Sequence, residues 1–227
     1  MKILAIDTSA LTATAAILAD GKLIAEISTT TALNHSVTVM PMIDELLEKV
    51  NMDISEIDLF ACSEGPGSFT GLRIGIGTVK GLAYGLEKKV VGVSTLEALA
   101  HNISFTDFTI APIMDARRGQ VYNALYKYDG EKLVTVTPPR ALSVEELCEE
   151  ISEKTIFVGD GVFAYKEKIK ETLGEKALFA TPQNMLQRAG SVAYAAQSIP
   201  PIDAEALTAV YLRKPQAERE REEKERI

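Results

Sequence analysis

Short apolar runs separated by turn residues open the chain. Residues 3–6, 14–18 and 23–27 are mostly Ile, Leu and Ala, and apolar runs of this length between turn residues are typical of strands. The Asp20-Gly21 pair between the second and third runs favours a tight hairpin turn. The pattern therefore predicts three strands in an antiparallel meander.

Helical spacing of apolar residues begins after residue 34. Apolar residues at positions 39, 43, 46 and 50 predict a helix from Asn34, its N-cap, to about Val50. Pro41 lies inside this pattern, which predicts a kink or a later start of the helix. Because helices and strands then alternate, we expect parallel strand pairing. The predicted strands lie at 57–62 and 90–93, and the predicted helices at about 69–86 and 94–102.

A second block begins near residue 108. Strands are predicted at 109–114, 121–128, 133–136 and 156–158, and helices after Ser143 and at about 163–173 and 184–198. A meander followed by strand–helix–strand units is typical of one half of an actin/Hsp70-type fold. We therefore predict an α/β protein with an actin/Hsp70-like, two-lobed fold and mixed sheets flanked by helices. The predicted parts are an N-terminal lobe at 1–103, a smaller α/β lobe at 104–213 and a charged tail at 214–227; a return of the last helix to the first lobe is left open.

Composition narrows the functional classes. The 227 residues carry a formal net charge of −8, which argues against nucleic-acid binding unless a local basic patch or a basic partner exists. Two cysteines, Cys62 and Cys148, cannot build a disulfide framework and fit a reducing compartment. Asp7 interrupts the first apolar run, unlike a secretory signal, and no stretch approaches the ~20 apolar residues of a membrane span. We expect a cytoplasmic protein that does not bind membranes.

The turn Asp7-Thr8-Ser9 after the first strand offers a carboxylate, hydroxyls and backbone amides. Such a turn can present these groups to a phosphate and its metal ion. Short turns of this composition also commonly use their side chains to satisfy their own backbone. Both interpretations stay open at the level of the sequence.

The segment Gly-Pro-Gly-Ser-Phe-Thr-Gly from Gly65 to Gly71 joins a strand to a helix. Glycines before a helix N-terminus can cradle an anion, because free amides and the helix dipole point at it. Leu72-Arg73 stands where a P-loop has Lys followed by Ser or Thr, and the third glycine comes one residue late for a dinucleotide fingerprint. A rigid turn in which Ser68 caps the helix is the alternative.

The helix predicted at 69–86 is unusually rich in glycine, with Gly71, Gly75, Gly77, Gly81 and Gly85. Each glycine inside a helix costs about 1 kcal/mol relative to alanine, so a compensating contact is expected. Four of these glycines, together with Thr78, follow helical spacing and should share one face that another backbone can approach closely. That backbone belongs either to the protein's own sheet or to a partner. Surplus apolar surface on the helix at 34–50 favours a partner.

Residues for catalysis are not evident. The two histidines, His35 and His101, do not form a metal-ligand pair such as His-x-x-x-His. No serine or cysteine has an evident histidine base for nucleophilic catalysis. We therefore expect no catalytic residue and no metal site in this chain.

Four segments resemble the TsaB family, also called YeaZ. They are residues 1–9, Asn34-His35-Ser36, the highly specific block at 65–75 and Val210-Tyr211-Leu212-Arg213. The family belongs to the actin/Hsp70/sugar-kinase superfamily and is related to the transferase TsaD. The resemblance implies a role in forming N6-threonylcarbamoyladenosine at position 37 of tRNAs that read codons beginning with A.

The resemblance further implies a scaffold rather than an enzyme. In the family's complex TsaD transfers the threonylcarbamoyl group, and TsaB is its non-catalytic, activating partner beside the ATPase TsaE. The implied assemblies are a heterodimer with TsaD, a ternary complex with TsaE and, without TsaD, a homodimer through the same surface. Contact with tRNA is expected only through the complex. No cofactor is expected on this chain alone, with ATP at the interface with TsaD left open; a stand-alone ATP-dependent enzyme of the superfamily is the alternative.

Individual residues carry these expectations. The implied partner interface comprises His35, Val39, Met42, Gly71, Arg73, Gly75, Thr78, Gly81, Leu82 and Gly85. A bulky residue at Gly75 or Gly81 should then block the partner and leave the monomer folded. Nucleotide or anion contacts are assigned to Asp7, Thr8, Ser9, Ser68, Arg117 and Arg118. Thr95 and Leu99 stand where the transferase has its metal-binding histidine pair, and neither binds a divalent metal well.

Overall fold

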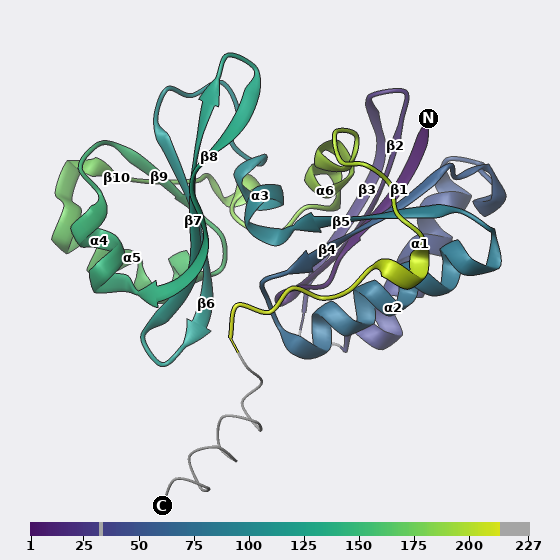
Figure 1. The fold of residues 1–227 in the computed structure, drawn as a ribbon, viewed down its shortest axis with the longest axis horizontal. Coiled ribbons are helices and arrows are strands. Elements are labelled where there is room, and N and C mark those ends of the chain that lie inside the picture. The colour runs from purple at the N-terminus through teal and green to yellow at the C-terminus, as the bar shows by residue number, and fades with distance from the viewer. Residues whose placement is uncertain (32–33, 214–227) are drawn as a thin grey trace, which may run out of the picture.

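A computed structural model describes residues 1–31 and 34–213 of the chain. Two lobes lie side by side, each built around a five-stranded sheet with helices packed against it (Figure 1). The charged tail expected at 214–227 lies outside the described residues. No helix within the described part of the chain has the length and hydropathy needed to cross a membrane.

The first lobe begins with the predicted meander. Strands β1 (Lys2–Asp7), β2 (Thr12–Ala19) and β3 (Lys22–Thr30) pair antiparallel. β4 (Leu59–Gly65) pairs parallel with β1, and β5 (Lys89–Ser94) pairs parallel with β4. The order is β3-β2-β1-β4-β5, so the turn after β1 lies at the carboxyl end of the central strand, where such sheets commonly bind ligands.

Helices cover both faces of this sheet. α1 (His35–Lys49) and α2 (Phe69–Gly85) pack on one face. Asn34 caps α1 through the Ser36 amide, as predicted, and Pro41 lies inside the helix. α6 (Ala189–Ala196), from the far end of the chain, packs its alanines and Val192 on the other face.

The second lobe is a mixed sheet in the order β10-β9-β6-β7-β8. Its strands are β6 (Thr109–Arg117), β7 (Gln120–Asp129), β8 (Lys132–Ser143), β9 (Thr155–Val158) and β10 (Ala177–Phe179). α4 (Val144–Glu150) and α5 (Gly161–Leu173) contribute to its core. α3 (Thr95–Ala100) lies between the lobes, with Leu96 and Leu99 in this core and Ala98 in the core of the first lobe.

The secondary structure departs from the sequence-based expectation in several places. β8 extends beyond 133–136 through two prolines, which an edge strand tolerates. The helix expected at 184–198 divides into the turn η3 (Pro182–Asn184) and α6, because the Asn102 side chain donates to the Asn184 and Leu186 carbonyl oxygens. The Ser94 side chain makes no capping hydrogen bond to α3. Further short elements are β10, η1 (Ile54–Glu56), η2 (Gly174–Lys176) and η4 (Ala204–Ala206).

Residues 202–213, here named the C-terminal strap, return along the first lobe (Figure 1). Ile202 and Val90 exchange two backbone hydrogen bonds of 2.9 Å, which covers the edge of β5. Lys80 of α2 donates to the carbonyl oxygens of Glu205 and Leu207 at 3.1 and 3.0 Å. The strap is thus fastened to both β5 and α2, and it ends at the boundary between the lobes.

Candidate functional site: the interlobe cavity and the α1–α2 surface

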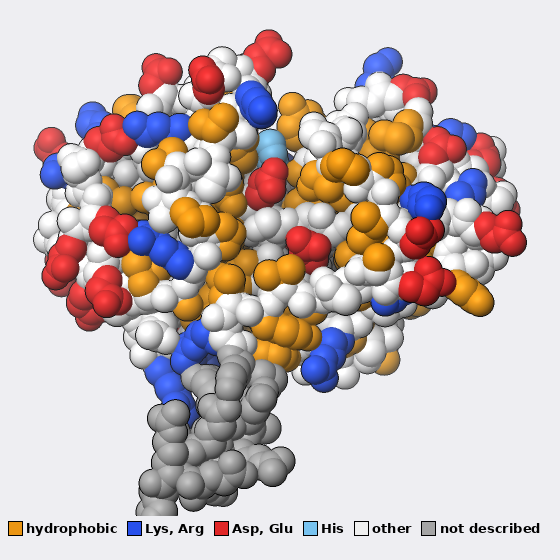
Figure 2. Space-filling model, viewed as in Figure 1, with side chains coloured by type: hydrophobic (Ala, Val, Ile, Leu, Met, Phe, Trp, Pro, Cys, Tyr) orange, Lys and Arg blue, Asp and Glu red, His pale blue; other side chains and the backbone are white. Residues whose placement is uncertain are grey.

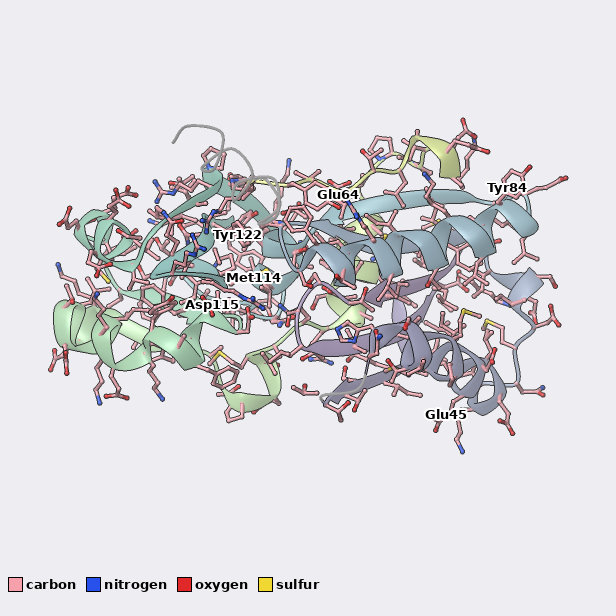
Figure 3. All side chains as sticks on the ribbon, turned by 90° about the horizontal axis from the view of Figure 1, so that it is seen from below. Glu45, Glu64, Tyr84, Met114, Asp115 and Tyr122 are labelled. Carbon is pink, nitrogen blue, oxygen red and sulfur yellow. The ribbon has the colours of Figure 1, made fainter. Side chains whose placement is uncertain are left out.

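A cavity of about 750 Å³ lies between the two lobes. The turn after β1, the start of α1 and the glycine loop line it from the first lobe, and the end of β6 with Tyr122 and Asp160 lines it from the second. Met114, Asp115 and Tyr122 lie where the second lobe approaches the first (Figure 3). Of the residues assigned to anion contact from the sequence, Ser9, Ser68 and Arg117 line the cavity.

Asp7 and Thr8 do not line the cavity, which corrects their assignment as direct nucleotide contacts. Asp7 is 1% exposed, and its carboxylate oxygens accept hydrogen bonds from the Ser9 amide at 2.8 Å and the Ser63 hydroxyl at 2.5 Å. The Thr8 hydroxyl donates to the Gly71 carbonyl oxygen at 2.8 Å. Asp7 and Thr8 therefore use their side chains within the fold, as the alternative interpretation predicted, whereas the buried Ser9 hydroxyl at the cavity has no hydrogen-bond partner among the described residues.

The electrostatics of Asp7 agree with a structural role. Burial raises the pKa of its carboxyl above the ordinary value, and the hydrogen bonds from Ser63 and Ser9 oppose this rise. A metal-binding carboxylate needs free lone pairs and a favoured charged form. Each oxygen of Asp7 accepts one hydrogen bond inside the protein, and the bond from Ser63 holds the turn against β4.

The glycine loop packs directly onto this turn. The Ser68 amide donates to the Ser9 carbonyl oxygen at 2.7 Å, and a Cβ on Gly67 would lie 2.5 Å from the same oxygen. The Ser68 hydroxyl accepts from the Gly71 amide at 3.3 Å and caps α2. Close packing therefore explains the glycine at position 67, and Ser68 caps α2 as the rigid-turn interpretation predicted, while the loop also lines the cavity.

The glycines of α2 divide between two faces, which corrects the prediction that they share one. Gly71 and Gly75 are buried; a Cβ on Gly71 would collide with the Thr8 carbonyl oxygen, and a Cβ on Gly75 would lie 2.6 Å from the Thr8 hydroxyl. Neither glycine can contact a partner, and a bulky residue at Gly75 would disturb the monomer. Gly77, Gly81 and Gly85 are exposed, and a Cβ on any of them would meet no atom within 4 Å.

Two interface assignments on α1 are wrong for the same reason. Val39 and Met42 are 1% and 7% exposed and belong to the core. His35 is half-buried, and its Nε2 lies 2.7 Å from the Ala10 carbonyl oxygen. Apolar side chains that α1 presents to solvent include Val37, 64% exposed, Met40, 39% exposed, and Pro41.

The outer faces of these two helices form what we call the α1–α2 surface. They lie on the same side of the first lobe when it is seen from below (Figure 3). Arg73, Gly81 and Gly85 of the predicted interface are exposed there, and Thr78 and Leu82 are half-buried. The α1–α2 surface comprises Val37, Met40, Pro41, Ile74, Gly77, Thr78, Gly81, Leu82, Tyr84 and Gly85, with Arg73 at its border.

Across the cavity, the turn between β6 and β7 carries charged residues. The Arg117 amide donates to the Asp115 carboxylate at 2.8 Å. Arg117 and Arg118 are exposed, in left-handed backbone conformations with φ of 62° and 56°. Arg118 does not line the cavity. Burial and the nearby Asp115 raise the pKa of Asp160 to about 6, which still leaves this carboxyl mostly ionised at pH 7.

The C-terminal strap brings in residues to which no role was assigned from the sequence. Tyr211 stacks on Phe69 with ring centroids 4.2 Å apart, and Arg73 Nε donates to its hydroxyl at 3.3 Å. Arg213 donates to the Ala116 carbonyl oxygen at 2.9 Å and so connects the strap to the second lobe. Tyr211 and Arg213 belong to the Val210–Arg213 segment, but nothing in their spacing indicates these distant partners.

The position of the transferase's metal pair is filled by core packing. Thr95 and Leu99 are 0% and 1% exposed. Within residues 1–31 and 34–213, no group of three His, Cys, Asp or Glu side chains is placed to hold a metal ion.

Comparison with solved structures first defines the class of protein. The chain matches component A of (R)-2-hydroxyglutaryl-CoA dehydratase from Acidaminococcus fermentans with a TM-score of 0.52 at 14% identity, over 86% of this chain and 97% of that chain. At this identity the likeness concerns the fold alone. With its two mixed sheets flanked by helices, the chain has the predicted actin/Hsp70-like, two-lobed fold.

Closer relatives then give the family. The family model of TsaD, tRNA N6-adenosine threonylcarbamoyltransferase, matches residues 23–219. The chain is 37% identical to the tRNA threonylcarbamoyladenosine biosynthesis protein TsaB of Bacillus subtilis, over 96% of both chains. It is 34% identical to Escherichia coli TsaB over 76% of this chain and 77% of that protein. YeaZ from Pseudomonas aeruginosa matches with a TM-score of 0.77 at 26% identity, covering 93% of this chain and 99% of that chain. The chain belongs to the TsaB (YeaZ) family.

Proposed function

We propose that this protein is the non-catalytic, activating subunit of a complex that forms N6-threonylcarbamoyladenosine at position 37 of tRNAs that read codons beginning with A. It acts by forming a heterodimer with the transferase TsaD. The function of relatives that match most of the chain, which are tRNA threonylcarbamoyladenosine biosynthesis proteins, supports the reaction. The open, glycine-rich outer side of α2 is the observation that carries the scaffold role, because it leaves room for another backbone.

The α1–α2 surface provides the docking site. Gly77, Gly81 and Gly85 leave three helical positions without side chains, and beyond the neighbouring backbone of α2 no atom of the described residues lies within 4 Å of where a Cβ would be. Exposed Val37 and Met40 flank them with apolar area. A partner helix can therefore approach α2 at backbone distance while it buries these side chains. The match of the TsaD family model to residues 23–219 supports a homologous transferase as that partner.

The buried polar groups of the turn after β1 support a scaffold rather than an enzyme. The Asp7 carboxylate is buried and accepts hydrogen bonds from Ser9 and Ser63. Thr95 and Leu99 are packed in the core. A stand-alone ATP-dependent enzyme would need a cation-binding carboxylate at such a turn. We therefore place transferase chemistry on the partner. ATP at the interface with TsaD, a ternary complex with TsaE, a cytoplasmic location and a homodimer through the α1–α2 surface belong to the same proposal.

Substitution of an outer glycine tests the docking site. Gly81→Arg should abolish the heterodimer with TsaD, because a long charged side chain would fill the open groove. The same change should leave the monomer at least as stable, since arginine favours a helix over glycine by about 0.7–1 kcal/mol. Ala164→Arg on exposed α5 is the matched control and should leave the heterodimer intact. If Gly81→Arg forms the heterodimer as fully as the wild type, the α1–α2 surface is not the docking site for TsaD.

Reconstitution tests the function itself. A mixture of tRNA, threonine, bicarbonate, ATP, TsaC, TsaD and TsaE should modify adenosine only when this chain is present. The Gly81→Arg variant should fail to restore modification, and Ala164→Arg should restore it fully. Undiminished modification without the chain would contradict an activating role, and turnover of Mg-ATP by the isolated chain would favour the stand-alone enzyme.

A further inference from the structure

Four arginines and two stacked aromatic rings meet at the mouth of the interlobe cavity. The arginines come from three separate parts of the chain: Arg73 from α2, Arg117 and Arg118 from the β6–β7 turn, and Arg213 from the C-terminal strap. Lys and Arg side chains gather at the lower end of the boundary between the lobes (Figure 2). We name this set, with Phe69 and Tyr211, the arginine–aromatic patch.

Hydrogen bonds and ring stacking bring these residues together. Arg73 Nε donates to the Tyr211 hydroxyl at 3.3 Å, and Tyr211 stacks on Phe69. Two residues farther along, Arg213 donates to the carbonyl oxygen of Ala116, the residue before Arg117. Arg73 and Arg117 both line the cavity, from opposite lobes. The patch therefore spans the cavity mouth from one lobe to the other.

The patch is positive on a protein whose formal net charge is −8. The carboxylates that face it through the cavity are Asp115 and Asp160. Asp115 accepts hydrogen bonds from the Arg117 amide and the Tyr165 hydroxyl, so its charge is already partly balanced. Arg73, Arg117 and Arg118 are exposed and make no ion pair with the described residues. Within the described part of the chain, no carboxylate therefore neutralises these three guanidinium groups.

We propose that the arginine–aromatic patch binds RNA, and that it contacts the phosphate backbone and an unstacked base of the tRNA bound by the complex. Exposed arginines pair with phosphates as two-pronged donors. Tyr211 is 38% exposed, and an exposed aromatic ring beside arginines provides a stacking surface for a base. The proposal rests on the proposed function, because it takes the tRNA of that complex as the ligand.

RNA fits the patch better than the other anionic ligands. A free nucleotide would be held inside the cavity, whereas Arg118 lies outside its lining and would contribute nothing. An acidic protein segment would need the arginines but not the stacked rings. A strand of RNA uses both, because its phosphates are repeated along the chain and its bases present flat faces.

The double variant Arg117→Gln/Arg118→Gln tests the proposal without touching the α1–α2 surface. In the assembled complex with TsaD, we expect tRNA affinity to fall about tenfold at low salt. The slope of log K against log salt should flatten by about 1.4–1.8, since each of the two lost phosphate contacts removes about 0.7–0.9 from it. Tyr211→Leu should weaken tRNA binding without flattening the slope. Lys170→Gln/Lys176→Gln removes the same charge at the far end of α5 and should change neither quantity.

Assembly with TsaD is measured in parallel with RNA binding, so that a failure of the RNA site can be distinguished from a failure of the proposed function. Normal assembly with unchanged tRNA affinity for the Arg117/Arg118 variant would overturn the RNA site, and so would equal losses in both double variants. Equal binding of polyglutamate and tRNA to the patch would reassign it to an acidic protein. If the wild-type chain does not assemble with TsaD, the proposed function fails. In that case, ultraviolet crosslinking of the isolated chain to tRNA tests the RNA site separately. Crosslinks at Phe69 and Tyr211 would support the site, and their absence would overturn it.

Discussion

The Thr8 hydroxyl donates a 2.8 Å hydrogen bond to the Gly71 carbonyl oxygen. This bond joins the turn after the central strand β1 to the first turn of α2. The backbones approach so closely that a Cβ at position 71 would collide with the Thr8 carbonyl oxygen. A segment whose composition resembles a phosphate loop is therefore used to lock a helix onto a sheet.

This packing predicts opposite effects of one substitution at two glycines of α2. Gly75→Ala should lower the free energy of unfolding by about 1–3 kcal/mol, because the added Cβ would lie 2.6 Å from the Thr8 hydroxyl. Gly81→Ala should raise it by up to about 1 kcal/mol, because Gly81 is exposed with open space around it. Urea unfolding of both variants measures the difference. Equal stabilisation by the two substitutions would contradict the close contact at Gly75.

The bond between Ser63 and Asp7 predicts a second effect. Ser63→Ala removes the hydroxyl that donates to the buried Asp7 carboxylate at 2.5 Å. A buried acceptor left without its donor should cost about 1–3 kcal/mol of stability. Ser152→Ala at an exposed position is the control and should change stability by less than about 0.5 kcal/mol. Chemical unfolding at pH 7 is the measurement. An unchanged free energy of unfolding in Ser63→Ala would show that the buried Asp7 carboxyl does not depend on this donor.

Asp160 predicts a dependence of stability on pH. Its pKa is raised from 3.8 to about 6 by burial and by Asp115, so the folded state holds this proton more tightly than the unfolded state. The resulting stabilisation is present below about pH 4 and is lost as pH rises through about 6. Asp160→Asn should therefore be more stable than the wild type at pH 8, by on the order of 3 kcal/mol.

Unfolding curves of wild type and Asp160→Asn across pH 4–8 check this prediction. The stability difference between the two proteins should shrink toward zero as pH falls to about 4. Asp107→Asn at an exposed site serves as the matched control. A difference that stays constant with pH would mean that Asp160 titrates alike in the folded and unfolded chain.

The stack between Phe69 and Tyr211 predicts energetic coupling between α2 and the C-terminal strap. With ring centroids 4.2 Å apart, a double-mutant cycle of Phe69→Leu and Tyr211→Leu should give a coupling of about 0.5–1.5 kcal/mol. A cycle of Phe69→Leu with Phe179→Leu in β10 should give none, because Phe179 contacts Phe157 in the core of the other lobe. Additive effects in the first cycle would show that the strap is not held by this stack.

Local features explain why much of the fold could be predicted. The Asp20-Gly21 hairpin, the Asn34 cap and the helix after Ser143, which begins with a Ser143–Glu146 capping box, occur as expected. Each depends on residues within a few positions of one another, so the sequence carries the whole signal. The prediction of one continuous helix at 184–198 was wrong. The side chain of Asn102, which is distant in sequence, donates hydrogen bonds to two carbonyl oxygens of this segment.

The sequence by itself determined the alternation of strands and helices, the two-lobed class and the unusual glycine content of α2. Only the tertiary structure decided which glycines are buried, since a helical repeat orders residues around an axis without saying which side meets the sheet. It also decided that Asp7 is engaged by Ser63 and that Arg73, Arg117 and Arg213 gather at one cavity mouth. These relationships join residues 44 or more positions apart, and spacing along a chain holds no information on contacts that only packing creates.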